Sequence, residues 1–166
     1  VAMQDAMIHY MRTCFSTMAR TGKPAQRNGA KSGGGNNAPS GLYPAKGGGP
    51  NDYVYVTTSR ANPEHWSRLM KLIGREELIN DPRFATGNDR VAHDKELDAI
   101  IGEWTQQHDK RDAMERLIAV GVPAGAVFDT MELQNEPTFV EHGFMQTVKH
   151  HNGEYKMASW PVRVDG

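Results

Sequence analysis

The stretch that decides the fold is Tyr53-Val54-Tyr55-Val56-Thr57-Thr58. β-Branched and aromatic residues are enriched in strands, so this run predicts a β-strand. Gly47–Asp52 marks a turn before it, and Asn62-Pro63-Glu64 after it has the N-cap residue and first-position proline of a helix start. A strand followed by a helix predicts a domain that mixes both elements.

Helices and short strands are predicted downstream of this unit. The first helix has one apolar face that includes Trp66 and Leu69, and Gly74 ends it. Further helix starts are indicated by paired residues three positions apart: Thr86 with Asp89, Asp109 with Asp112, and Asp129 with Glu132. The strands predicted here are Ala126–Phe128 and a hairpin of Phe144–Val148 with Tyr155–Ala158 around a turn at Asn152-Gly153.

Upstream of the deciding strand, Gly41–Lys46 predicts a strand at a sheet edge, because Pro44 cannot donate to a central ladder. The first twenty residues predict a strand end that runs into an amphipathic helix. Its apolar stripe recurs every three or four residues and needs a sheet or another chain to cover it. The stripe is Met3, Met7, Tyr10, Cys14 and Met18.

The predicted fold class is therefore α+β, a small domain of helices packed on a small antiparallel sheet. Composition divides the chain into residues 1–22, a glycine-rich linker or loop at 23–50, and a small domain at 51–166. Because the chain opens at Val1 inside a structured pattern, we expect it to be a piece of a longer polypeptide.

Composition limits the function classes. The 166 residues are 38% hydrophobic and 23% charged, which is typical of a globular protein. A formal net charge of −1 gives no basic field to attract nucleic acid or an anionic membrane surface, and no apolar run approaches the length of a membrane span. Cys14 is the one cysteine, so we expect no internal disulfide and a reducing, cytoplasmic compartment.

The most unusual local feature is Gly33-Gly34-Gly35 followed by Asn36. Successive glycines let the backbone approach a ligand closely, and free N–H groups there can bind an anion or cover a reactive intermediate. On composition alone, a flexible linker is the favoured explanation of the stretch. The P-loop pattern GxxxxGK[ST] is absent, so a Walker phosphate loop is excluded.

The titratable residues do not assemble an active site by pattern. The histidines are scattered without a metal-ligand spacing, so no metal site is predicted. The carboxylates at predicted helix starts are explained most simply as caps or dipole partners. These are Asp5, Asp89, Asp109, Asp112 and Asp129.

Taken in order, these segments resemble family III CoA-transferases, the CaiB/BaiF family, and are most similar to members that act on formyl-CoA and oxalate. The similarity covers essentially the entire chain. It rests on Val1–Ala6, Gly33–Asn36, Tyr53–Thr58 with Asn62–Gly74, Asn80–Phe84 with Arg90, Gly121–Gly125 with Asp129, Asn135–Pro137 with Gly143-Phe144, and Trp160–Arg163.

The resemblance implies that residues 1–22 end a large Rossmann-like domain and that the chain is the C-terminal, small-domain part of an enzyme. That enzyme moves CoA from an acyl-CoA to a free carboxylic acid through an aspartyl-CoA intermediate. Gly33, Gly34, Gly35 and Asn36 would form its active-site loop, which opens and closes over the intermediates to exclude water.

The resemblance also implies an interlocked homodimer, an acyl-CoA and a carboxylic acid as substrates, and no permanently bound cofactor. The nucleophilic Asp belongs to the region before Val1, and Asp5 does not match its motif. We therefore expect no catalytic residue in this chain, and no turnover by the chain alone.

Two alternatives stay open. A fragment of an α-methylacyl-CoA racemase would share the family, but the glycine stretch favours a transferase. A stand-alone acyl-CoA-binding or interaction module would need a self-sufficient fold, which the uncovered stripe of the first helix argues against.

Overall fold

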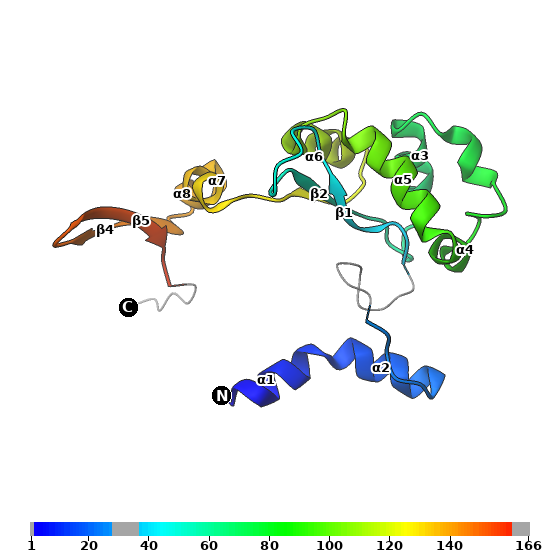
Figure 1. Cartoon of the computed structure of the whole chain (residues 1–166), viewed down its shortest axis with the longest axis horizontal. Helices are drawn as coiled ribbons and strands as arrows, with labels where there is room; N and C mark the ends of the chain where they lie inside the picture. The colour runs from blue at the N-terminus through cyan, green and yellow to red at the C-terminus, as the bar shows by residue number, and fades with distance from the viewer. Residues whose placement is uncertain (1, 28–36, 161–166) are drawn as a thin grey trace. The chain divides into compact units, whose positions relative to one another are not determined.

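A computed structural model describes residues 2–27 and 37–160 (Figure 1). Internal contacts divide the chain into two compact units, Val1–Val127 and Phe128–Gly166. The elements of the first unit are α1 (Met3–Tyr10), α2 (Arg12–Thr21), β1 (Ser40–Pro44), β2 (Tyr53–Thr57), α3 (Glu64–Leu72), the 3₁₀ helix η1 (Glu76–Asn80), α4 (Gly87–Ala92), α5 (Asp94–Thr105), α6 (Lys110–Ala119) and β3 (Ala124–Ala126).

The deciding strand is β2, and it lies at the centre of an antiparallel sheet of order β1-β2-β3. β1 pairs Leu42 with Tyr55, and its place at the sheet edge confirms the expectation drawn from Pro44. The predicted strand Ala126–Phe128 was wrong by two residues. The pairing of Tyr55 with Gly125 centres β3 on Ala124–Ala126, where small residues carry little strand signal.

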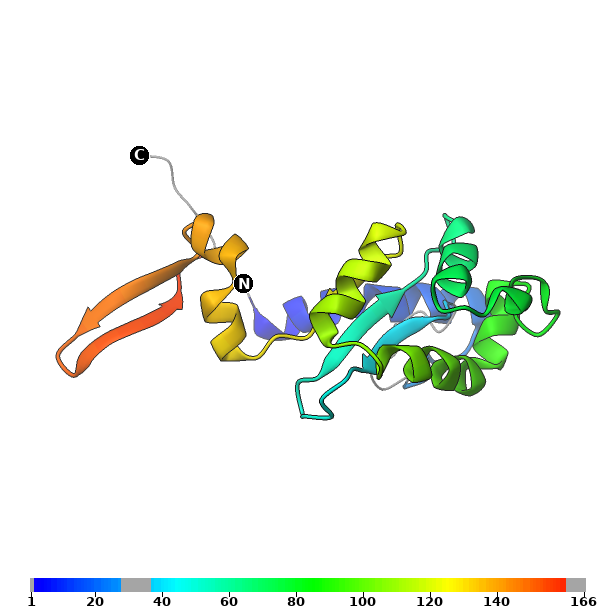
Figure 2. The same ribbon diagram turned by 90° about the horizontal axis from the view of Figure 1, so that it is seen from above.

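Alternation along β2 gives its two sides different surroundings. Val54 and Val56 are fully buried, whereas Tyr53, Tyr55 and Thr57 on the other side are half-buried. Helix α5 contacts β1, and α6 contacts β2 and β3 (Figure 2). The core joins the valines to apolar side chains of these helices and of α3, among them Leu69, Met70, Leu97, Ile101, Ala113 and Leu117.

The capping box predicted at Thr86 and Asp89 is confirmed, but the helix after it is divided. Helix α4 ends at Ala92 and α5 begins at Asp94, because His93 has a non-helical backbone (φ −111°, ψ 28°). Its ring Nδ1 lies 3.0 Å from the Asp89 carbonyl oxygen, which ties the side chain to the end of α4.

The expected N-terminal helix is likewise two helices, α1 and α2, separated at Met11. None of their described residues is buried within the chain. Met3 is 86% exposed and Tyr10 is 85% exposed. The apolar stripe therefore has no cover among the described residues.

The second unit contains α7 (Thr130–Asn135), α8 (Pro137–Glu141), β4 (Met145–His150) and β5 (Gly153–Ala158). The capping box of Asp129 and Glu132 is confirmed, and α8 was not predicted. The hairpin is confirmed, but its turn was placed one residue too late. His150 pairs with Gly153, so His151 and Asn152 form the connection, and the positive φ falls on Gly153 (135°).

Candidate functional site

The predicted loop residues Gly33, Gly34, Gly35 and Asn36 lie outside the described residues. The first described residues after them are Asn37–Ser40, which we call the anchor segment. Ala38 and Ser40 are only 6% and 7% exposed, and Pro39 is fully buried. The chain therefore enters the protein interior directly after the glycine stretch.

Backbone groups of the anchor segment are bonded to the end of β2. The Thr58 N–H donates to the Pro39 carbonyl oxygen at 3.0 Å, which extends the β1–β2 ladder by one step. The Asn37 side chain, through Nδ2, donates to the Thr58 carbonyl oxygen. The segment is thus held against β2 from both of its own ends.

Arg90, on α4, also contacts the anchor segment. Its Nε donates to the Ala38 carbonyl oxygen at 2.9 Å, and its Nη1 donates to the Phe84 carbonyl oxygen at 2.9 Å. The guanidinium carbon lies 4.9 Å from the ring centroid of Trp66 on α3, in a cation–π contact. Burial lowers the pKa of Arg90, although a guanidinium stays charged at neutral pH.

A chain of hydroxyl groups lies on the half-buried side of the sheet beside the anchor segment. The Thr57 hydroxyl donates to Ser40 Oγ at 3.1 Å, and Ser40 Oγ lies 2.9 Å from the Tyr55 hydroxyl. Side chains that are two apart along β2 share this side. The arrangement places uncharged hydrogen-bonding groups next to the point where the glycine stretch ends.

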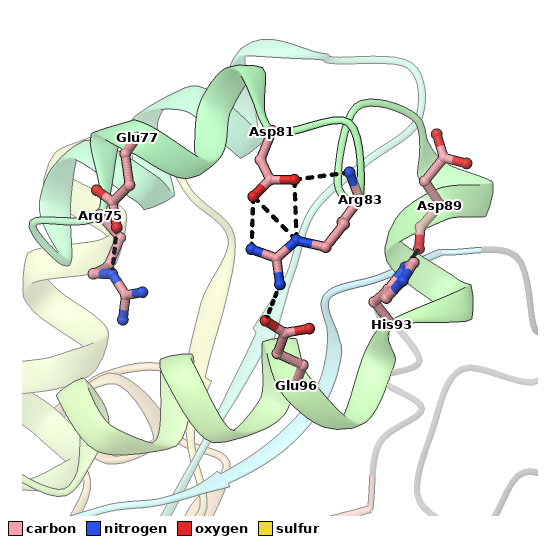
Figure 3. A network of polar contacts seen from close by, with 7 residues as sticks. All are labelled: Arg75, Glu77, Asp81, Arg83, Asp89, His93 and Glu96. Atoms are coloured by element: carbon pink, nitrogen blue, oxygen red, sulfur yellow. Dashed lines mark hydrogen bonds and ion pairs between the residues drawn. The ribbon is translucent and has the colours of Figure 1, made fainter.

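An ion-pair network precedes α4 (Figure 3). Arg83 bonds both carboxylate oxygens of Asp81, at 2.7 Å from Nη2 and 3.1 Å from Nε, and also pairs with Glu96 on α5. The hydrogen bonds from Arg83 hold the pKa of Asp81 below its usual value. The network links the turn after η1 to α5 through Glu96.

Most predicted caps are confirmed. Asp89 and Asp129 complete capping boxes, and Asp109 accepts from two N–H groups of α6. Asp112 pairs instead with Arg116 and with His108, at 2.8 and 2.7 Å, and the hydrogen bond from Arg116 is the main cause of its lowered pKa. Asp5 lies in the first turn of α1 without a capping contact to Ala2.

Outside these contacts, the described residues 2–27 and 37–160 have few features typical of other kinds of site. No group of three or more His, Cys, Asp or Glu side chains there is placed to hold a metal ion. Within the same ranges, no helix has the length and apolar character that crossing a bilayer requires. A surface hollow of about 210 Å³ between α3 and α5 is lined by Ile73, Arg75, Ile100, Glu103, Trp104 and Gln107.

The fold is a mixed α/β domain in which several polar contacts hold the segment that follows a glycine-rich stretch. Comparison with known proteins then identifies the family. The model of the family "CoA-transferase family III" matches residues 1–166, so the chain belongs to this family.

Relatives and solved structures agree with this membership. The chain is 32% identical over 178 aligned positions to a formyl-CoA:oxalate CoA-transferase of Streptomyces coelicolor, covering 99% of this chain and 42% of the relative. It is 34% identical over 105 positions to the succinyl-CoA–D-citramalate CoA-transferase of Chloroflexus aurantiacus, covering 63% and 25%. A CaiB/BaiF family protein from Brucella suis matches with a TM-score of 0.75 and 27% identity, over 96% of this chain and 39% of that one.

The chain therefore spans about two fifths of the length of the relatives that it matches throughout. In the sequence, Arg90 was one of the residues that carry the family resemblance, and no role was predicted for it. Arg90 and Ala38 are 52 residues apart in the sequence, and no local sequence pattern predicts a contact over that separation.

Proposed function

We propose that this chain is the small-domain portion of an enzyme that transfers CoA from an acyl-CoA to a free carboxylic acid. The observation that carries the proposal is the 32% identity to a formyl-CoA:oxalate CoA-transferase along 99% of the chain. Because this relative is named for formyl-CoA and oxalate, these are the substrates to test first. The parent enzyme would act as an interlocked homodimer in the cytoplasm, with no permanently bound cofactor.

In this proposal the reaction passes through an aspartyl-CoA thioester on an aspartate outside the chain. The carboxylate attacks the acyl-CoA carbonyl and displaces CoA as a thiolate, which leaves a mixed anhydride. The thiolate then attacks the aspartyl carbonyl, which releases the donor acid and forms the aspartyl-CoA thioester. The acceptor acid attacks that thioester and receives CoA by the same two exchanges.

Gly33, Gly34, Gly35 and Asn36 are proposed to cover these intermediates, which water would otherwise hydrolyse. The firm attachment of Asn37–Ser40 supports this assignment, because a segment that excludes water needs a fixed end. Glycines also let backbone N–H groups approach the reacting carbonyl closely. The two curated relatives named above are both CoA-transferases, which favours transfer over the racemase alternative.

The test is a CoA-transfer assay with formyl-CoA and oxalate on the longest native polypeptide that contains this chain, beside residues 1–166 alone. We expect oxalyl-CoA from the longer polypeptide and none from the chain alone. Replacing Gly34 with Val should lower transfer by roughly 10- to 100-fold and raise hydrolysis of formyl-CoA. Gly125→Val, in β3, is the control outside the stretch, because its backbone has no positive φ and an added Cβ meets no atom within 4 Å. A longer polypeptide that racemises 2-methylacyl-CoA and transfers no CoA would disprove the proposal.

A further inference from the structure

The contacts of Arg90 lead to an inference that rests on the proposed function and deepens it. We propose that Arg90 is a positioning residue for CoA transfer, which holds the anchor segment Asn37–Ser40 in the place that the reaction requires. Its guanidinium connects three segments that are far apart in the sequence: the anchor segment, the turn before α4, and the indole of α3.

The geometry makes the role specific to arginine. Nε and Nη1 donate in different directions, to Ala38 and to Phe84, while the flat face of the same group lies over Trp66. A planar guanidinium can make all three contacts at once, whereas an ammonium group has neither the fork nor the face. Ala38 is buried, and its carbonyl oxygen also accepts from the Thr58 hydroxyl, at 3.5 Å. Losing the shorter bond from Arg90 would leave the oxygen with the longer and weaker one, which would favour movement of the segment away from β2.

The surroundings of Arg90 do not serve stability alone. The Trp66 indole N–H is buried and finds no acceptor among residues 2–27 and 37–160. Buried donors without a partner are uncommon in folded proteins, and each one requires an explanation. Placing the half-buried Arg90 guanidinium beside the unpaired Trp66 N–H costs desolvation free energy. A requirement for a fixed backbone at Ala38 would explain why this cost is tolerated.

The variants Arg90→Met and Arg90→Lys separate this role from a general loss of charge. Arg83→Met is the matched control: Arg83 also lies near α4 and over the Phe84 ring, at 5.2 Å, but it contacts Asp81 and Glu96 and not the anchor segment. Each variant is made in the longest native polypeptide that contains this chain and assayed with formyl-CoA and oxalate.

We expect Arg90→Met to lower kcat for transfer by roughly 10- to 100-fold, with KM for formyl-CoA changed less than about threefold. Arg90→Lys should recover only part of kcat, since one bond to Ala38 can form. Arg83→Met should keep kcat within about twofold. The Thr58 amide, which donates to Pro39, should exchange with solvent faster in Arg90→Met than in Arg83→Met.

An unchanged kcat in a folded Arg90→Met protein would overturn the proposal, and so would full recovery by Arg90→Lys. Equal protection of the Thr58 amide in Arg90→Met and wild type would also overturn it. The proposed function fails in a different way, because the wild-type polypeptide itself would then transfer no CoA.

Discussion

The first unit, Val1–Val127, which we call the sheet-containing region, and the C-terminal unit, Phe128–Gly166, both begin helices with capping boxes. They differ in how many of their side chains are buried. Capping boxes start α4 at Thr86 and α7 at Asp129. Beneath α4 and its neighbours lies a core in which Leu69, Phe84 and Leu97 are fully buried. Among the described residues from 128 to 160, none is buried. Local hydrogen bonds can therefore specify a conformation in both regions, but burial stabilises only one of them strongly.

The C-terminal unit is held instead by short-range contacts. The Phe144 N–H donates to the Phe139 carbonyl oxygen at 2.9 Å, and the two rings lie 6.0 Å apart. Lys156 donates to the Asn135 side chain at 3.2 Å, which links β5 to α7. A two-stranded hairpin with contacts of this kind is marginally stable in water.

The strongest test of this comparison removes equivalent apolar groups from the two regions. Leu69→Ala should lower the free energy of unfolding by about 2–5 kcal/mol, because it leaves a cavity in a closed core. Val148→Ala, on the partly exposed strand β4, should cost less than about 1 kcal/mol. Urea unfolding followed by tryptophan fluorescence measures both values. Similar losses from the two variants would mean that the hairpin is buried as deeply as the core.

A medium-sized effect is expected when each capping box is broken. Thr86→Ala and Asp129→Ala should each cost about 1 kcal/mol, because an N-terminal N–H loses its acceptor. The first loss should appear in the cooperative unfolding of the core. The second should appear only as faster amide exchange in α7, with the urea midpoint of the core unchanged. A shifted midpoint in Asp129→Ala would show that the two regions unfold together.

The smallest expected effect is a change in how the stability of the sheet-containing region depends on pH below about 4. Arg83 lowers the pKa of Asp81 in the folded state, so the ionised carboxylate favours folding. That contribution is complete above the ordinary Asp pKa of about 4 and is lost as the pH falls through the lower folded value. Asp81→Asn should flatten the decline of Tm below pH 4, and Asp109→Asn, away from the network, is the control. An identical decline in Asp81→Asn and wild type would contradict the assignment.

Much of this fold could be predicted, because its signals are local. The composition of Tyr53–Thr57 and the residues at Thr86, Asp109 and Asp129 specify one strand and three helix starts without help from distant residues. The misplacement of β3 has a physical origin. Ala124, Gly125 and Ala126 have low strand propensity, and pairing with β2 alone makes them a strand.

The candidate site was less accessible from the sequence. Composition singled out the glycine stretch, and the resemblance supplied its role as an active-site loop. That role stays a prediction because Gly33–Asn36 lie outside the described residues. The domain limits 1–22, 23–50 and 51–166 also stay predictions. Contacts such as that of Arg90 with Ala38 depend on where α4 lies relative to the anchor segment, and no periodicity or motif in the sequence specifies that geometry.

The order of strands in the sheet has a consequence for how the chain folds. β1 and β2 are close in sequence, so their hairpin can form early and on its own. β3 can pair with β2 only after the intervening stretch from α3 to α6 has been synthesised and brought back to the sheet. Closing this long loop costs conformational entropy, which contacts within the stretch must offset. During synthesis, the edge of β2 that will pair with β3 therefore has unpaired backbone N–H and C=O groups until Ala124–Ala126 leaves the ribosome.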